Sequence, residues 1–192
     1  MPALGAHGAA ALAERLLRHT LASACAAELG PVELCCTPDT EHPAFLACAR
    51  EFNATLSRQC DGDLGQRMAS AARRALARAR SVLIIGTDCP ALAPTQLNTA
   101  ARILNAGHDA VFVPATDGGY VLLGLRRVDR HLFSAIRWGT ATVMTETRKR
   151  LTELGWQWAE LPALPDIDEP ADLRHVPIAL LPAAPNLSPD EE

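Results

Sequence analysis

Several features that would exclude or assign whole classes of protein are missing from this sequence of 192 residues. No apolar stretch approaches the length of a membrane span, and the N-terminus lacks the charged start and apolar centre of a signal peptide. The six cysteines form no CxxC pair of the kind found in zinc sites and redox motifs, and most lie among apolar residues. We therefore expect a cytoplasmic protein with reduced cysteines and no membrane span.

A dense basic stripe is also missing. The chain carries 18 basic and 22 acidic residues, a net charge of -4, and its closest basic cluster, Arg73 to Arg80, is spaced like the solvated face of a helix. We therefore expect no nucleic-acid partner. With 48% hydrophobic and 21% charged residues the composition is that of an ordinary globular domain, which we place at residues 1–178, followed by a Pro-rich acidic flexible tail at 179–192.

Helical and strand-like segments alternate along the chain, with no visible internal repeat. This alternation predicts an α/β domain with a largely parallel sheet. The expected helices are 9–29, 42–50, 64–79, 94–106 and 140–154, and the expected strands are 31–37, 54–59, 81–85, 109–114, 120–125 and 156–161. The strand at Ser81–Ile85 is apolar without alternation, as expected for a buried parallel strand covered on both faces.

Aspartates follow two of these strands. Asp88 comes directly after the strand that ends at Ile85, and Asp117 follows the strand that ends at Pro114. Ligands in open α/β sheets bind outside the carboxyl ends of the strands, which favours a functional role for both side chains. The alternatives are that Asp88 caps a turn or helix start and that Asp117 with Gly118-Gly119 forms a simple hairpin turn.

A third acidic segment, PDIDEPADL, lies before a short late helix. It places Asp166 and Asp168 just before the start of that helix, where either side chain could also act as an N-cap. Aspartates that converge at strand ends could hold Mg²⁺ or Mn²⁺, hard cations that take oxygen ligands and bridge to phosphates. The three segments together therefore suggest a metal-dependent nucleotide site.

Five motifs, in this order, resemble those of the bacterial glycosyltransferase A-like family, a group of nucleotide-diphospho-sugar transferases related to molybdenum cofactor guanylyltransferase-type nucleotidyltransferases. They are QCDGDLGQRM (59–68), IIGTDCPAL (84–92), PATDGGYVLLGL (114–125), LFSAIRWGTATV (132–143) and DIDEPADL (166–173). The resemblance implies a GT-A, Rossmann-like domain. It also implies transfer of a sugar from a nucleotide-diphospho-sugar to a small-molecule acceptor, with Mg²⁺ or Mn²⁺ as cofactor.

The resemblance assigns roles to individual positions. Asp88 matches the aspartate that holds the metal after a central strand, and Asp168 is the best match for a second metal ligand. Asp117 and Asp88 are the implied catalytic carboxylates, with Asp117 orienting or deprotonating the acceptor hydroxyl. The remaining implied substrate-binding and nucleotide-binding positions are Asp61, Gly62, Asp63, Gly65, Gly118, Gly119, Tyr120, Trp138, Gly139 and Thr140. For the loop around Asp61 the alternative is a turn followed by Asp63 as a helix cap.

The chain also departs from the family pattern at its start. Relatives begin with an apolar strand and a basic, glycine-containing loop, whereas this sequence opens with MPALGAHGAAALAERLL, already at the following helix. We therefore expect a sheet that lacks the first strand. Two alternatives to glycosyl transfer remain: nucleotidyl transfer to a small phosphorylated substrate, and a non-catalytic binding or accessory role. The sequence does not determine the sugar, the base, the acceptor or the oligomeric state.

Overall fold

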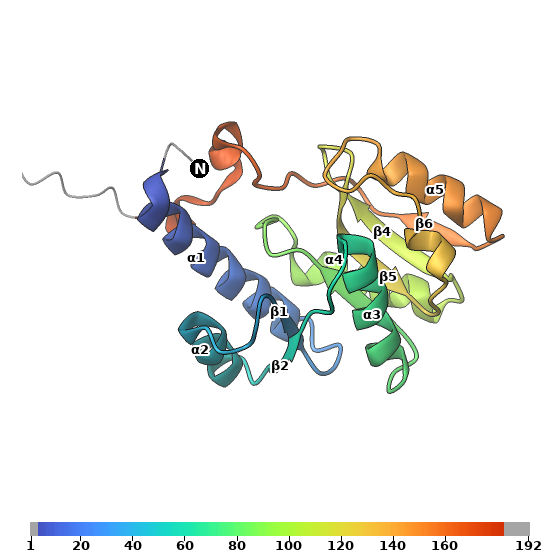
Figure 1. The fold of residues 1–192 in the computed structure, drawn as a ribbon, viewed down its shortest axis with the longest axis horizontal. Helices are drawn as coiled ribbons and strands as arrows, with labels where there is room; N and C mark the ends of the chain where they lie inside the picture. The colour runs from blue at the N-terminus through green and yellow to red at the C-terminus, as the bar shows by residue number, and fades with distance from the viewer. Residues whose placement is uncertain (1–3, 183–192) are drawn as a thin grey trace, which may run out of the picture.

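The computed structural model describes residues 4–182, and the helices and strands occur in the predicted order (Figure 1). They are α1 (Gly5–Ala26), β1 (Glu33–Cys36), α2 (Pro43–Glu51), β2 (Thr55–Arg58), α3 (Leu64–Leu76), β3 (Val82–Ile85), α4 (Pro94–Asn105), β4 (Ala110–Pro114), β5 (Tyr120–Leu125), α5 (Val143–Glu153) and β6 (Trp158–Glu160). Short 3-10 helices η2 (Arg130–Phe133), η3 (Pro170–His175) and η4 (Ile178–Leu180) complete the described part. In that part, no helix has the length and apolar character needed to cross a membrane.

The main sheet has four strands in the order β3-β5-β4-β6. β5 is antiparallel to both of its neighbours, and β4 and β6 are parallel, so β3, β4 and β6 all run in the same direction. This confirms the α/β class with a mostly parallel sheet flanked by helices. β5 is the exception because it returns from β4 through a tight turn, with Pro114 opposite Tyr120.

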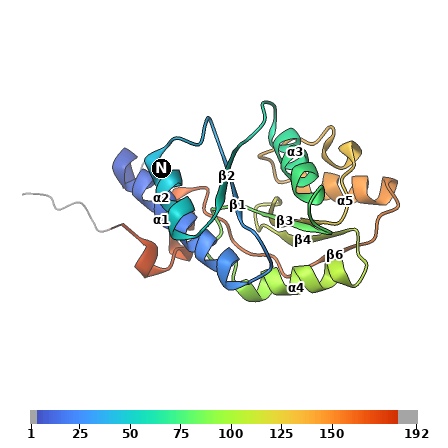
Figure 2. The same cartoon turned by 90° about the horizontal axis from the view of Figure 1, so that it is seen from below.

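Helices cover both faces of this sheet. Figure 2 shows α4 on one side and α3 and α5 on the other. Along β4 the side chains alternate, with Phe112 packing toward Met68 and Leu151 on one face and Val111 packing toward Leu104 on the other. Four of the five β4 residues, from Ala110 to Val113, have no exposed surface, so β4 is the centre of the core.

β3 does not match the prediction of a buried parallel strand. Each residue from Val82 to Ile85 is partly exposed, and the strand pairs antiparallel with β5. The reason is its place in the sheet, because β3 lies at one end and no strand of the described residues pairs with its outer edge.

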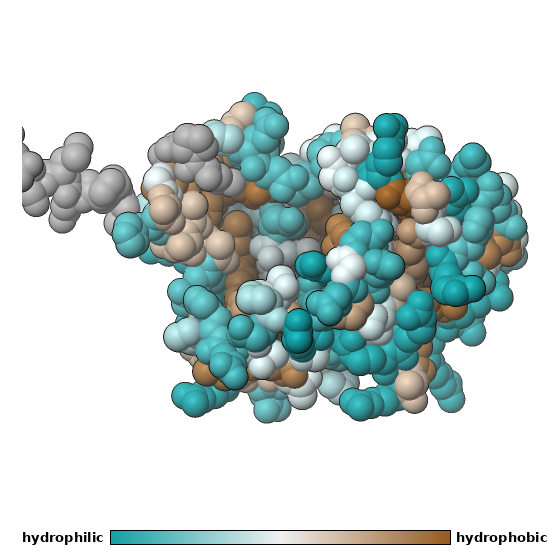
Figure 3. All heavy atoms as spheres, viewed as in Figure 1, coloured by the Kyte–Doolittle hydropathy of each residue, from teal (hydrophilic) through white to brown (hydrophobic). Residues whose placement is uncertain are grey.

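β1 and β2 form a separate parallel sheet, with Glu33 opposite Thr55. Two helices connect it to the rest of the molecule. Arg74 of α3 donates to Glu33 at 2.8 Å and to Ser57 at 3.2 Å, and the His19 ring of α1 lies 2.9 Å from the Pro90 carbonyl. Figure 3 shows hydrophobic residues gathered where the α1 part meets the main-sheet part, with polar residues over much of the remaining surface in this view.

After β6 the chain returns to α1 across the strand ends (Figure 1). We call residues 162–181 the C-terminal strap. Its apolar side chains, Ile167 and Val176 above all, pack on Leu12 and Leu16 of α1. Leu180 and Leu181 belong to the same cluster, so the packed structure extends past residue 178, where we expected the tail to begin; residues 183–192 of that tail lie outside the described part.

Candidate functional site

The turn between β4 and β5 holds Asp117 in place. The Gly119 N–H donates to Asp117 Oδ1 at 2.8 Å, and the Met144 N–H, at the start of α5, donates to the Gly118 carbonyl at 2.8 Å. Gly118 has φ +99°, and a Cβ there would lie 2.3 Å from the carbonyl oxygen of Ala141. Only glycine therefore lets this turn approach the segment before α5 so closely. The Gly-Gly pair does form a hairpin turn, and that turn presents a carboxylate.

Asp88 lies in the loop after β3. Its carboxylate folds back over Gly86, where a Cβ would lie only 2.5 Å from Asp88 Oδ1. Burial raises the pKa of Asp88 above its ordinary value, and the charges of Asp168 and Asp117 raise it further. The three carboxylates are therefore electrostatic neighbours at one edge of the sheet.

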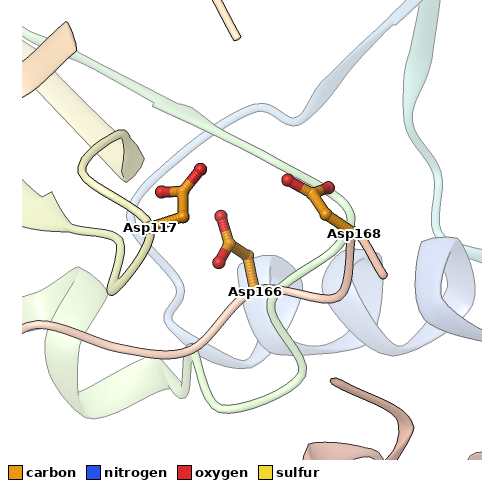
Figure 4. Close-up of side chains that lie close together, drawn as sticks. All are labelled: Asp117, Asp166 and Asp168. Carbon is orange, nitrogen blue, oxygen red and sulfur yellow. The ribbon is translucent and has the colours of Figure 1, made fainter. Parts of the chain in front are cut away.

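The C-terminal strap brings Asp166 and Asp168 to the same edge. The Leu164 N–H donates to the Pro114 carbonyl at 3.0 Å, and the Ile167 N–H donates to the Asp88 carbonyl at 3.0 Å. The strap is thus hydrogen-bonded to the end of β4 and to the loop after β3. Ile167 is buried against α1, while the aspartates on either side of it point back toward Asp117 (Figure 4). The cap of η3 comes from Asp172, which accepts from the Glu169 N–H at 2.8 Å.

Asp117, Asp166 and Asp168 form the acidic cluster. One carboxylate oxygen from each lies within 4.8 Å of those of the other two (Figure 4). Burial raises the pKa of Asp166 to about 6, with the charge of Asp117 as the next cause. Three carboxylate oxygens at this spacing fit a hard divalent cation such as Mg²⁺ or Mn²⁺.

The sequence grouped Asp166 with the acidic segments that could hold a metal but named only Asp88 and Asp168 as ligands. The structure places Asp166 between the other two aspartates of the cluster (Figure 4). A signal was present in the alternation of Asp166, Ile167 and Asp168, which in an extended segment directs both carboxylates to one side. Asp88, expected as a metal ligand, borders the cluster and is outside its set of three.

Three of the other motif residues, Gly65, Trp138 and Tyr120, pack in a row. A Cβ at Gly65 would lie 2.6 Å from the Trp138 ring, and Trp138 meets Tyr120 edge-on with ring centroids 6.5 Å apart. Tyr120 packs on Phe112, and its hydroxyl contacts Met68 Sδ at 3.8 Å, so the ring belongs to the core. Burial accordingly raises the pKa of Tyr120.

The loop before α3 and the segment before α5 are local turns. Asp63 caps α3 by accepting from the Gln66 N–H at 2.8 Å, after Gly62 at φ +114°, whereas the Asp61 side chain is 97% exposed. Thr140 Oγ1 donates to the Arg137 carbonyl at 2.8 Å and follows Gly139 at φ +73°. For the loop around Asp61, the sequence had left open the alternative of a turn followed by Asp63 as a helix cap, and the structure has this cap.

Comparison with solved structures supports the fold. The "putative nucleotide-diphospho-sugar transferase" of Desulfovibrio desulfuricans G20 is similar with a TM-score of 0.76 and 28% identity, over 85% of this chain and 72% of that one. A CMP:2-keto-3-deoxy-manno-octonic acid synthetase complexed with CTP has a TM-score of 0.55 at 14% identity, over 83% and 85% of the two chains. A cytidylyltransferase of Leptospira borgpetersenii serovar Hardjo-bovis (strain JB197) has a TM-score of 0.52 at 15% identity, over 77% and 64%.

Sequence comparison assigns a family. A search of curated proteins found no match. A family model described as "Uncharacterized protein conserved in bacteria (DUF2064)" matches residues 20–140, a range that includes Asp88 and Asp117 and ends before the strap. The resemblance to nucleotide-diphospho-sugar transferases that the five motifs indicated is confirmed at the level of fold, and the chain belongs to the bacterial family DUF2064.

Proposed function

We propose that this protein is a metal-dependent transferase that moves a sugar from a nucleotide-diphospho-sugar to a small acceptor. The observation that carries the proposal is the acidic cluster, in which Asp117 from the β4–β5 turn meets Asp166 and Asp168 from the C-terminal strap. Three carboxylates brought together from distant parts of the chain repel one another, and a bound cation offsets that repulsion. The fold shared with a nucleotide-diphospho-sugar transferase structure supports the same assignment.

The cluster would hold Mg²⁺ or Mn²⁺ through Asp117, Asp166 and Asp168, with Asp88 beside them. A bound cation supplies Lewis-acid stabilisation of the charge that develops on a leaving diphosphate. The Gly119 N–H occupies one oxygen of Asp117, so this hydrogen bond holds the carboxylate in a fixed orientation toward the cluster.

In this proposal Asp88 accepts the hydrogen bond of the acceptor hydroxyl. Its pKa is raised by burial and by the neighbouring aspartates, which makes it a stronger base than an exposed aspartate. The Ile167 N–H bond to the Asp88 carbonyl fixes this loop relative to the cluster. Asp117, expected from the sequence to contact the acceptor, serves here as a cation ligand.

A second reaction, nucleotidyl transfer, is supported by the two structures named for cytidylyl or CMP transfer, whose fold this chain shares. The two reactions differ in product. Sugar transfer releases a nucleoside diphosphate, whereas nucleotidyl transfer from a nucleoside triphosphate releases pyrophosphate.

The test is a thermal-shift and calorimetric screen of nucleoside diphosphates, triphosphates and nucleotide sugars, each with and without Mn²⁺. We expect Mn²⁺-dependent binding that raises the melting temperature by mass action, and we expect Asp168→Asn to abolish it. Glu28→Gln is the matched control, because Glu28 is exposed and lies outside the cluster and outside all five motifs. The absence of any Mn²⁺-dependent nucleotide binding would refute the proposal, and binding without turnover would favour an accessory role.

A further inference from the structure

A small cavity lies on the α1 side of Asp88. Its volume is about 160 Å³, and it is bounded by α1 on one side and by Thr87, Asp88 and Ile167 on the other. On the scale of about 30 Å³ per water molecule, this volume holds a group of roughly five non-hydrogen atoms. It reaches a residue of the candidate site, so its contents bear on the function of that site.

The cavity is open because the helix presents short side chains there. Ala9 and Ala13 face the loop, while Leu12 and Leu16 are engaged with Ile167 and Val176 in the cluster that holds the strap. Ala13 is exposed, so the cavity opens to solvent and a ligand can enter it. A longer side chain at Ala9 or Ala13 would fill the space.

The lining specifies the chemistry of an occupant. All of the wall residues are alanine, leucine or isoleucine except Thr87 and Asp88. No cationic side chain lines it, and Asp88 brings negative charge, so the lining disfavours a phosphate or carboxylate. A short aliphatic group with a hydroxyl fits both the apolar and the polar part of the lining, because its carbon atoms contact the apolar wall and its O–H donates to the Asp88 carboxyl.

The position of the cavity connects it with the acidic cluster. The Asp88 carbonyl accepts from the Ile167 N–H, and the two residues that flank Ile167 supply carboxylates to the cluster. A hydroxyl held at Asp88 is therefore beside the cluster, on its α1 side.

We propose that this cavity is the acceptor subsite and that it binds a small, uncharged aliphatic alcohol. The identification of the bound alcohol as the acceptor rests on the proposed function. The binding of an alcohol can be measured without any nucleotide or metal.

The experiment is a methyl NMR titration of the protein with propane-1,2-diol, using the methyl signals of Ala9, Ala13 and Ile167. The matched probe is dimethoxymethane, an ether that is an isomer of the diol and so has the same number of non-hydrogen atoms, but has no O–H to donate to Asp88. Inorganic phosphate is the third probe. We expect saturable shifts with the diol, binding at least about fivefold weaker for the ether, and no saturable shift with phosphate.

Ala13→Leu and Ala10→Leu form the pair of variants. Ala13 lines the cavity, whereas Ala10 is exposed on the same helix and is not part of the lining. We expect Ala13→Leu to weaken diol binding at least about tenfold and Ala10→Leu to leave it unchanged. Both variants keep the acidic cluster, so Mn²⁺-dependent nucleotide binding remains in both if the proposed function is correct.

Saturable diol binding that Ala13→Leu does not weaken, phosphate binding at these methyl groups, or no saturable shift with the diol would each overturn the subsite. If the diol binds in the cavity but Mn²⁺ promotes no nucleotide binding, the cavity stands as an alcohol site and the proposed transferase function is wrong.

Discussion

Individual carboxylates decide the electrostatics of the candidate site. Asp166 is half-buried between two other aspartates, and its pKa is raised from the ordinary 3.8 to about 6. A raised carboxyl pKa means that the folded state binds more protons than the unfolded state between these two pH values. The contribution of Asp166 to stability is therefore fully present below about pH 4 and is lost as the pH rises to about 6.

Asp166→Asn should separate stability from binding. Without metal at pH 7 we expect the variant to melt at a higher temperature than the wild type, because the substitution removes a repelled charge. We also expect it to bind Mn²⁺ about tenfold or more weakly, because a ligand atom is lost, a change of about 1.4 kcal/mol. Melting curves from pH 4 to 7 and calorimetric Mn²⁺ titrations measure the two effects.

Glu28→Gln serves as the control for both effects, and it should change neither the melting temperature nor Mn²⁺ binding appreciably, because Glu28 is exposed and outside the cluster. A metal-free Asp166→Asn protein that melts below the wild type at pH 7 would show that Asp166 stabilises the fold, contrary to this account.

At the scale of elements, β3 is the strand whose environment differs most from the one that its sequence predicts. Its four aliphatic residues are typical of a central strand, yet its outer edge is unpaired within residues 4–182. The Gly86 N–H donates to the Val121 carbonyl, and antiparallel pairing alternates, so the Ile84 N–H also faces β5. The Leu83 and Ile85 N–H groups consequently face the open edge.

We predict an alternating pattern of amide hydrogen exchange along β3. Leu83 and Ile85 should exchange at least about tenfold faster than Ile84 and Gly86, because their N–H groups lack a strand partner on the open edge. Exchange measured by NMR at several protein concentrations tests this. If Leu83 and Ile85 were as protected as Ile84, the edge would be paired in solution by another strand or another copy.

At the scale of the whole molecule, two sheets that differ in burial share one chain. β1 and β2 have four residues each and are mostly partly exposed, whereas β4 is buried along most of its length. The smaller sheet depends on α1 and α3 for its connection to the main sheet, and the contact of Arg74 with Glu33 and Ser57 is part of that connection.

The smaller sheet should therefore open before the main sheet. We predict that Arg74→Met lowers the opening free energy of β1 and β2 amides by about 1 kcal/mol, the usual scale of a partly exposed ion pair, and leaves β4 and β5 unchanged. Native-state hydrogen exchange measures this difference. Arg73→Met, an exposed neighbour on the same helix, should change neither sheet; equal loss of protection in both sheets after Arg74→Met would mean that they open as one unit.

The sequence alone was sufficient for the element order, the α/β class and the family resemblance. The spacing of apolar residues shows which face of a segment is apolar, and it depends only on residues that are close together in the chain. Strand-end position also selected Asp88 and Asp117, because the sheet of an α/β domain gathers the ends of its parallel strands at one edge, and the family resemblance selected Asp168.

Only the tertiary structure decided which carboxylates meet. Asp166 joins the cluster because Ile167 is buried on α1 and its N–H bonds to the Asp88 loop, contacts between residues more than 70 positions apart. The exposure of β3, the packing of Tyr120 in the core and the cavity beside Asp88 depend in the same way on what lies next to each residue in space. Burial and charge coupling are properties of neighbours, and a local pattern does not specify neighbours that are distant in the chain.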